Sequence, residues 1–130
     1  MALSILETVI YMTDLDAAEA FYGDLIGLEK IVRHENRHVF FKCDGSVFLV
    51  FNPDATENSK GDVPGHGTRG RGHFCFAASR EEQDDWERKL NGAGYPTVSK
   101  VDWPNGAKSV YFTDPGGNSV EFGEPALWGF

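Results

Sequence analysis

The sequence predicts an α+β fold in which one pattern, a strand followed by a helix and three strands, occurs twice. In each half, a run rich in β-branched and aromatic residues precedes a segment with a helical apolar stripe. Gly27 and Gly94 stand where the two helices are expected to end. Because 130 residues with 41% hydrophobic content suit a single core, we interpret the chain as one pseudo-twofold domain.

The first module is predicted over residues 4–52. Its elements are a strand over residues 4–12, a helix capped by Asp14, and short strands over residues 28–33, 38–42 and 46–51. Alternation along the first strand places Glu7 on the same face as Val9 and Tyr11. Asp44-Gly45 is a typical hairpin turn between the last two strands.

The second module is predicted over residues 72–123. Its elements are a strand over residues 72–78, a helix that begins with the capping box Ser79–Glu82, and strands over residues 96–101, 108–113 and 119–122. The stretch DPGGNSVEF, residues 114–122, is a tight turn that runs into the last strand, where Glu121 lies on the opposite face to Val120 and Phe122. A carboxylate in an apolar strand is either buried, and then paired or metal-bound, or exposed as a solubilising charge.

Residues 53–71 join the modules and contain prolines and glycines but almost no large apolar side chain. We expect a long linker or a loop over a site. The run GHGTRGRG within it lacks the Lys-Ser/Thr ending of a phosphate-binding loop and leads into a strand. The C-terminal tail, residues 124–130, is more apolar than a free end requires.

Net charge and cysteine usage narrow the choice of partners. With 12 basic against 20 acidic residues the formal charge is −8, which argues against nucleic acid and anionic membranes and permits a small molecule or a divalent metal ion. Cys43 and Cys75 do not form a CxxC pair, so we expect buried free thiols in a reducing cytoplasm. A cytoplasmic location also agrees with the lack of a recognisable signal peptide or an apolar run of roughly 20 residues.

Three motifs occur in order along the chain: DL…FY…LIGLE within residues 14–29, GHFCFA at residues 72–77, and DPGGNSVEF at residues 114–122. In these motifs and in its repeat, the sequence resembles the vicinal oxygen chelate superfamily, which includes glyoxalase I, fosfomycin-resistance thiol transferases, methylmalonyl-CoA epimerase, extradiol dioxygenases and bleomycin-binding proteins. The resemblance covers nearly the whole chain. It implies two βαβββ modules that form an open, curved mixed sheet around a cavity.

The resemblance also implies a metal site built from the first and last strands of the modules. When the two halves are overlaid, Glu7 aligns with His73, and Phe48 in SVFLVF aligns with Glu121 in SVEF. Glu7, His73 and Glu121 are then the expected ligands of one divalent metal ion, and Phe48 stands where glyoxalase I has a glutamate. Plainer interpretations exist: His73 as a hydrogen-bonded histidine, and Glu7 as a general base or a surface carboxylate.

One imidazole and two carboxylates form an oxygen-rich ligand set, which favours Mn²⁺, Mg²⁺, Fe²⁺ or Ni²⁺ and also allows Zn²⁺. Three protein ligands with open positions are typical of a catalytic rather than a structural metal ion. The set differs from the two histidines and one carboxylate of non-haem iron oxygenases, which weakens the dioxygenase interpretation. Cys75 shares the face of His73, and there we expect a packed thiol rather than a thiolate ligand.

The expected substrate pocket is aromatic with a few polar side chains. Its candidate residues are Phe48, Arg37, His66, Trp103 and Tyr111. Arg37 lies in the segment RHENRH, which either binds an anionic substrate or is a solvated turn. His66 either gates the cavity, contacts the substrate, or is an ordinary exposed loop histidine. Because strand faces alternate, some of the aromatic residues are expected in the core.

Three functions stay open. The first is a metal-dependent enzyme of the glyoxalase-like type, with isomerase, lyase or transferase chemistry on a small substrate and Glu121 or Glu7 as the catalytic base. The second is a metal-free protein that sequesters a drug, as the bleomycin-resistance members do. The third is a non-catalytic dimeric scaffold. The resemblance further implies a homodimer, in some members with modules exchanged, and the apolar tail around Leu127, Trp128 and Phe130 suits such an interface.

Overall fold

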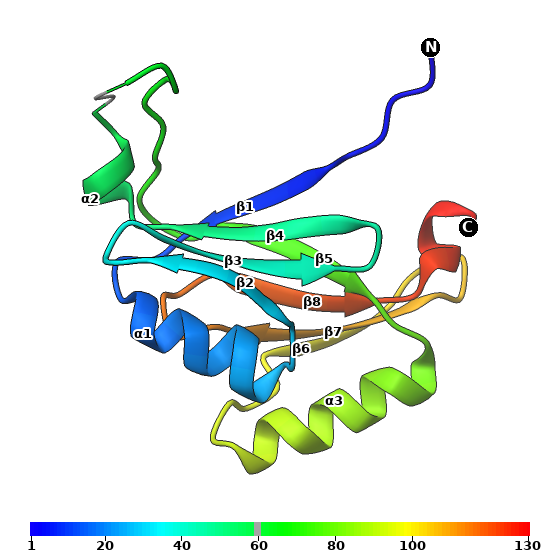
Figure 1. The fold of residues 1–130 in the computed structure, drawn as a ribbon. Coiled ribbons are helices and arrows are strands. Elements are labelled where there is room, and N and C mark those ends of the chain that lie inside the picture. The colour runs from blue at the N-terminus through cyan, green and yellow to red at the C-terminus, as the bar shows by residue number, and fades with distance from the viewer. Residues whose placement is uncertain (59–60) are drawn as a thin grey trace. The chain divides into compact units, whose positions relative to one another are not determined.

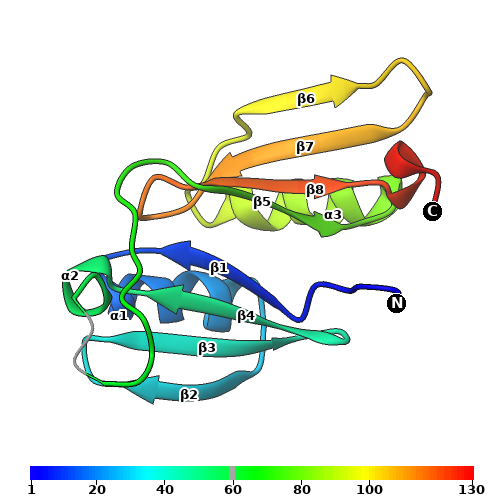
Figure 2. The same ribbon diagram turned by 90° about the horizontal axis from the view of Figure 1, so that it is seen from above.

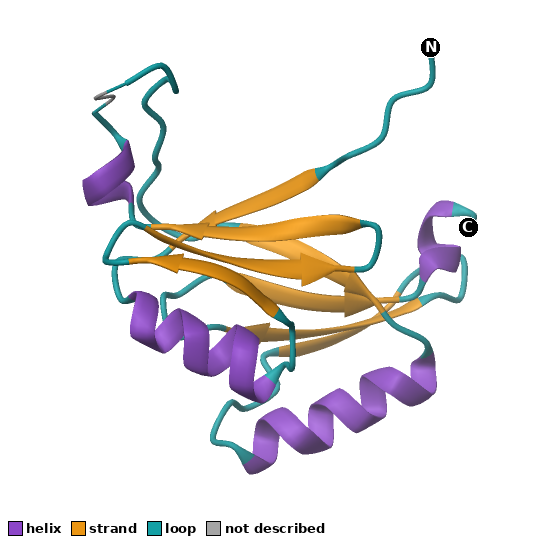
Figure 3. Ribbon diagram, viewed as in Figure 1, coloured by secondary structure: helices purple, strands orange, loops and turns teal. Residues whose placement is uncertain are grey.

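The computed structural model describes residues 1–58 and 61–130, which form two compact units, residues 1–72 and residues 73–130. Each unit contains a four-stranded mixed sheet (Figure 1), and Figure 3 distinguishes its strands from its helices. The predicted α+β fold with two βαβββ modules is confirmed. Residues 59 and 60 of the predicted linker lie outside the described residues. In the described part of the chain, no helix is long and apolar enough to cross a membrane.

The first unit forms the sheet β1-β4-β3-β2, seen from above in Figure 2. β1 is parallel to β4, and the other neighbouring strands are antiparallel. The elements of this unit are β1 (Glu7–Tyr11), α1 (Leu15–Ala18), η1 (Glu19–Leu25), β2 (Lys30–His34), β3 (His38–Cys43), β4 (Ser46–Phe51) and α2 (Pro53–Thr56).

The helix formed by α1 and η1 packs on one face of the first sheet. Asp14 caps it by accepting a hydrogen bond from the Ala17 backbone nitrogen at 3.0 Å, and Gly27, with φ of 91°, follows its end. Its C-terminal part is a π-helix in which Phe21 and Tyr22 are buried. The buried core of this unit includes Ile10, Leu15, Ala18, Phe21, Tyr22, Val39, Phe41, Phe48 and Val50.

The second unit forms the sheet β5-β8-β7-β6, in which β5 is parallel to β8 and the other neighbours are antiparallel. β7 has the predicted bounds, whereas β6 begins at Ser99 rather than at residue 96. The elements of this unit are β5 (His73–Ala77), α3 (Arg80–Gly92), β6 (Ser99–Asp102), β7 (Lys108–Thr113), β8 (Ser119–Gly123) and η2 (Pro125–Trp128).

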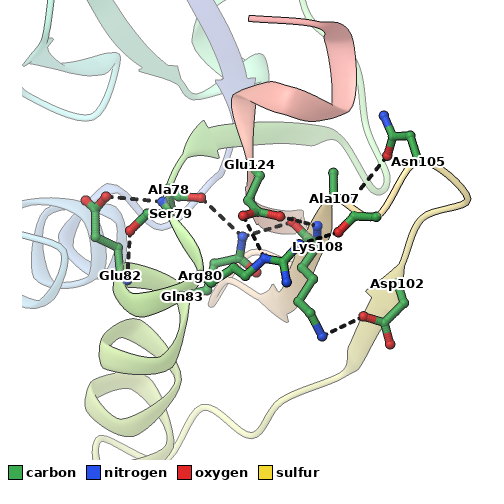
Figure 4. Close-up of polar contacts among 11 residues, drawn as sticks. Ala78, Ser79, Arg80, Glu82, Gln83, Asp102, Asn105, Ala107, Lys108 and Glu124 are labelled. Atoms are coloured by element: carbon green, nitrogen blue, oxygen red, sulfur yellow. Dashed lines mark hydrogen bonds and ion pairs between the residues drawn. The ribbon is translucent and has the colours of Figure 1, made fainter.

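α3 covers one face of the second sheet. Its capping box is confirmed: Ser79 Oγ accepts a hydrogen bond from the Glu82 backbone nitrogen at 3.2 Å, and Glu82 Oε1 accepts one from the Ser79 backbone nitrogen at 3.1 Å (Figure 4). Trp86 stacks on Phe122 with ring centroids 5.1 Å apart. The core of this unit includes Phe74, Leu90, Val110, Phe112, Val120 and Phe122. Side chains that alternate with these along the strands face away from α3.

A group of polar contacts ties the start of α3 to β7 and to the end of β8 (Figure 4). The buried Gln83 side chain donates to the carbonyl oxygens of Ala78 at 3.2 Å and Lys108 at 2.9 Å. Arg80 Nε donates to Glu124 Oε1 at 2.9 Å, and Glu124 Oε2 accepts from the Lys108 backbone nitrogen at 2.7 Å. The contacts fix the helix on the sheet whose opposite face carries the candidate site.

Replacement of Gln83 by alanine is expected to lower the free energy of unfolding by about 1–3 kcal/mol, because two backbone carbonyl groups lose their buried donor. Urea unfolding followed by tryptophan fluorescence measures the change. Glu81→Ala, at an exposed position of the same helix, is the matched control and should change stability by about 0.5 kcal/mol or less. Equal unfolding midpoints for the two variants would contradict this role of Gln83.

Candidate functional site

A polar cluster lies on the face of the second sheet that points away from α3. Cys75 of β5 and Tyr111 of β7 are the register neighbours of Glu121 on β8. His73 and Ser109 share this face because each lies two residues away along the same strands. Three adjacent strands therefore bring one imidazole, one carboxylate, one thiol and two hydroxyl groups together.

The imidazole of His73 faces the carboxylate of Glu121. His73 Nε2 lies 3.2 Å from Glu121 Oε1, and the two side chains are 51% and 7% exposed. His73 Nδ1 lies 3.1 Å from the carbonyl oxygen of Ser119, which can only accept, so Nδ1 carries a proton. A lone pair on Nε2 would repel the facing carboxylate oxygen. A proton shared by the two atoms, or a cation between them, makes the contact favourable.

The pair fits a divalent metal ion. Two ligand atoms of an octahedral ion, each about 2.1 Å from it, lie about 3 Å apart in adjacent positions, and the contact between His73 and Glu121 has close to this length. A backbone carbonyl on the second ring nitrogen is also a usual support of a metal-binding histidine. Among the residues that the structure describes, no three His, Cys, Asp or Glu side chains are grouped for one metal ion. The second unit thus brings together two of the three predicted ligands.

The other carboxylate oxygen of Glu121 is held by the protein itself. Glu121 Oε2 accepts a hydrogen bond from Ser109 Oγ at 2.8 Å, and Ser109 Oγ accepts one from Trp103 Nε1 at 2.9 Å. The thiol of Cys75 is hydrogen-bonded to Glu121 and also lies 3.4 Å from the carbonyl oxygen of Phe76. Trp103, predicted as a pocket aromatic residue, therefore contacts this cluster through its indole N–H group.

Tyr111 completes the cluster beside His73. The two rings are stacked, with centroids 6.0 Å apart and an interplanar angle of 21°. Burial of the phenol and its hydrogen bond to Glu121 raise the pKa of Tyr111 to about 12. Its hydroxyl group therefore keeps its proton at neutral pH and acts as a donor.

Cys75 is expected to react slowly with alkylating reagents in the metal-free protein. Burial, the negative charge of Glu121 and a hydrogen bond to that carboxylate raise the pKa of the thiol from 9.0 to about 12. At pH 8 this lowers the thiolate fraction, and with it the rate of iodoacetamide labelling, by about a thousandfold. The rate is measured on a chelator-treated Cys43→Ser variant, against N-acetylcysteine as the control. Labelling of Cys75 as fast as the control would contradict the raised pKa.

Glu7, the third predicted ligand, lies in the first unit. It is the first residue of β1, and its side chain is exposed. Its neighbour on β4 is Val47, just as Ser119 of β8 is the neighbour of His73. Glu7 and His73 therefore occupy the same position in the corresponding strands, β1 and β5, of the two modules.

Phe48 is not the counterpart of Glu121 that the overlay predicted. In the second module, His73 pairs with Ser119, and Glu121 lies two residues further along β8. In the first module, Glu7 pairs with Val47, and the residue two further along β4 is Leu49. Phe48 points to the opposite face, where it is buried against Tyr22 with ring centroids 4.9 Å apart. The side chain therefore belongs to the helix-facing core of the first unit, which is a correction to the overlay.

Arg37 and His66, two predicted pocket residues, both lie against Phe51 in the first unit. His66 Nδ1 lies 2.7 Å from the Tyr11 hydroxyl, and its ring meets Phe51 edge-on at 4.6 Å. The guanidinium of Arg37 lies 5.7 Å from the centroid of the same ring and donates to His38 Nδ1 at 2.6 Å. Burial and the charge of Arg37 lower the pKa of His38, so this imidazole is neutral and accepts the bond.

The described part of the predicted linker is anchored on α2. Arg69 pairs with Asp54 at 2.6 Å and with Glu57 at 2.7 Å. The His66 backbone nitrogen donates to the carbonyl oxygen of Thr56 at 2.9 Å. These contacts hold the segment that carries His66 against α2, and the role of His66 toward a substrate stays a prediction.

The residues predicted for the site do not include Ser109 or Phe51, whereas His38 belongs to the segment RHENRH, which was predicted either to bind an anionic substrate or to form a solvated turn. Ser109 has the same parity as Tyr111 in the strand predicted over residues 108–113, so alternation alone could have placed both on one face. No comparable signal exists for Phe51, whereas the place of His38 beside Arg37 in RHENRH is such a signal. Their contacts come from His66 and Arg37, which lie in connections between strands.

Comparisons with known proteins agree with the fold. A family model described as Glyoxalase/Bleomycin resistance protein/Dioxygenase superfamily matches residues 4–122. The crystal structure of a lactoylglutathione lyase from Agrobacterium tumefaciens is 45% identical, with a TM-score of 0.94 over 98% of this chain and 97% of that one. A glyoxalase-related enzyme from Fulvimarina pelagi shares the fold at 19% identity, with a TM-score of 0.76 over 97% and 91% of the two chains. No curated protein matches the chain significantly.

Proposed function

Because the chain belongs to the glyoxalase/bleomycin resistance protein/dioxygenase superfamily, we propose that it is a glyoxalase-type enzyme that acts on a small molecule and uses one divalent metal ion. The observation that carries the proposal is the contact of His73 Nε2 with Glu121 Oε1, while Nδ1 of the same ring donates to a backbone carbonyl. The 45% identity to a protein named lactoylglutathione lyase supports lyase chemistry. Lactoylglutathione is therefore the first substrate to assay.

The proposed metal ligands are His73 and Glu121 of the second unit and Glu7 of the first. Support for Glu7 comes from its position in β1, which matches that of His73 in β5. One imidazole and two carboxylates suit Mn²⁺, Ni²⁺, Fe²⁺, Mg²⁺ or Zn²⁺. A divalent ion held by these residues supplies positive charge that stabilises an oxyanion on the substrate.

Glu121 is the proposed catalytic base, and Glu7 is the second candidate. Glu121 Oε2 is occupied by the Ser109 hydroxyl, so Oε1 would both bind the metal ion and, when released from it, exchange a proton with the substrate. A carboxylate held in this way can take a proton from a carbon next to a carbonyl group and return it to the neighbouring atom. The Tyr111 hydroxyl, whose pKa is about 12, stays protonated during such a transfer.

Metal content of the protein purified without an affinity tag tests the proposal. The wild type, incubated with Mn²⁺, Ni²⁺, Fe²⁺, Mg²⁺ or Zn²⁺ and then desalted, is expected to retain one equivalent of at least one ion. His73→Ala and Glu121→Ala should not retain the ion, and Glu7→Ala should bind it more weakly than the wild type. Glu81→Ala, on the exposed side of α3, is the control that should bind as the wild type does.

Two outcomes would overturn the metal-dependent enzyme. One is equal metal retention by the wild type, His73→Ala and Glu121→Ala. The other is no retention of any ion by the wild type. Stoichiometric binding of a cationic drug such as bleomycin by the metal-free protein would instead support sequestration.

We further propose that the protein is a homodimer. The tail exposes Trp128 (77%) and Phe130 (92%), and covering such large apolar side chains with a second copy is favourable. Light scattering at micromolar concentration should give twice the mass of the chain, and Trp128→Ser should shift the protein toward the monomer. A monomeric wild type would remove this proposal.

The two cysteines bear on where the protein works. Cys43 and Cys75 are both free thiols, but Cys43 is only half-buried and Cys75 is exposed, so the expectation of buried thiols was wrong. Free thiols suit the reducing cytoplasm that we propose as the location of the protein. Fractionation of cells that express the unmodified chain tests this, and recovery of the chain outside the cytoplasmic fraction would contradict it.

A further inference from the structure

Ser109 occupies a buried position between an indole and the carboxylate of Glu121. It is 2% exposed on β7 and lies opposite Gly123 in the register. Its hydroxyl accepts from Trp103 Nε1 at 2.9 Å and is 2.8 Å from Glu121 Oε2. An indole N–H can only donate and an ionised carboxylate can only accept. The bond between Ser109 and Glu121 therefore uses the proton of the Ser109 hydroxyl, and Tyr111, which is hydrogen-bonded to both residues, adds a second hydroxyl to this group.

Gly123 leaves the space in which this contact forms. A Cβ atom at this position would lie 3.0 Å from each of Cys75 Sγ, Glu121 Oε2 and Ser109 Oγ. Its φ angle is not in the left-handed region, so backbone conformation does not require a glycine. A glycine inside a strand costs stability and often marks close approach of other groups. Here the groups that approach are the carboxylate and its donors.

The two oxygens of Glu121 consequently have different environments. Oε2 is held by Ser109, whereas Oε1 faces His73 Nε2 at 3.2 Å. Rotation of the carboxylate or a change of its rotamer would break the bond to Ser109. Together with the hydrogen bonds of Cys75 and Tyr111 to the same carboxylate, this bond selects the orientation in which Oε1 meets the imidazole.

We propose that Ser109 is a positioning residue, which Trp103 orients and Gly123 accommodates, and which holds the Glu121 carboxylate with Oε1 toward His73. The orientation itself is a property of the metal-free protein. Its consequence for metal affinity rests on the proposed function. Residues that support a metal ligand in this way typically change metal affinity by about 10-fold to 100-fold when they are removed.

Crystal structures of the metal-free wild type, Ser109→Ala, Trp103→Phe and Gly123→Ala test the orientation. Ser109→Ala and Gly123→Ala are expected to lose the contact between Glu121 Oε1 and His73 Nε2. Trp103→Phe keeps the hydroxyl but frees its direction, so Glu121 should occupy more than one conformer. Gly92→Ala, where an added Cβ meets nothing within 4 Å, is the matched glycine control and should leave the contact as it is.

Titration calorimetry with Ni²⁺ gives the second readout. Ser109→Ala and Gly123→Ala are expected to bind Ni²⁺ about 10-fold to 100-fold more weakly than the wild type, and Gly92→Ala equally well. If Ser109→Ala does not fold, Trp103→Phe, which removes the indole N–H group but keeps an aromatic ring, decides the question by the same two readouts.

An unchanged Glu121 orientation in Ser109→Ala and Trp103→Phe would overturn the inference, whatever the metal affinity. A wild type that binds no Ni²⁺, Mn²⁺ or Zn²⁺ while the variants lose the contact would count against the proposed function and support the positioning role. The two failures are therefore distinguishable.

Discussion

Glu121→Gln is expected to lower turnover of lactoylglutathione by about 100-fold to 10,000-fold, the usual contribution of a general base. The amide cannot take up a proton, and it cannot offer a negative oxygen to a metal ion. Its shape still matches the site: the amide oxygen can accept from Ser109, and the amide nitrogen can donate to His73 Nε2. The loss of activity should therefore occur without loss of the fold.

Steady-state kinetics, with the thioester absorbance of lactoylglutathione as the signal, measures this effect, and circular dichroism checks the fold. Glu81→Gln is the matched control because it makes the same change at an exposed position of α3. If Glu121→Gln turned over substrate within twofold of the wild type while Glu7→Gln lost activity, the base would be Glu7. If Glu121→Gln and Glu7→Gln both turned over the substrate as fast as the wild type, neither residue would be the base.

Phe122→Ala should produce the largest loss of stability, about 3–5 kcal/mol in the free energy of unfolding. Phe122 is 1% exposed and stacks on Trp86 with ring centroids 5.1 Å apart. It also lies next to Glu121 in β8, so its packing supports the strand that carries the carboxylate. Alanine would leave a cavity between α3 and the sheet that the backbone cannot fill.

Urea unfolding measures this loss, with Leu3→Ala as the control because that side chain is 93% exposed and lies outside the tail proposed for the dimer interface. The control should change stability by about 0.5 kcal/mol or less. A loss below about 1 kcal/mol for Phe122→Ala would mean that the interface between α3 and the sheet relaxes around the cavity, contrary to the close packing described above.

Local signals predicted the elements that local chemistry determines. The capping box at Ser79 and Glu82 and the Asp44-Gly45 turn, where Gly45 has φ of 71°, depend only on residues close in sequence. The bounds of β4 and β7 were predicted correctly for the same reason, since a short alternating run between turn residues has little freedom. β6 was predicted to begin at residue 96 but begins at Ser99. The Val98 backbone nitrogen donates a hydrogen bond to the Tyr111 carbonyl oxygen, but Val98 is not paired in the ladder between β6 and β7.

The overlay of the two modules failed by one residue at Phe48, and the reason is register. Matching the letters SVF to SVE ignores the pairing of each last strand with the first strand of its own module. That pairing aligns Leu49, not Phe48, with Glu121. Because side chains alternate, a shift of one residue moves a side chain to the opposite face.

The sequence by itself determined that Glu121 and His73 belong to strands and that each module repeats the same order of elements, because periodicity and turn residues act locally. Only the tertiary structure decided that these two side chains meet at 3.2 Å, and that Ser109 and Trp103 hold the second carboxylate oxygen. The contact between His73 and Glu121 joins β5 to β8, whose pairing depends on ladder hydrogen bonds between residues far apart in the sequence, so no local pattern in the chain specifies it.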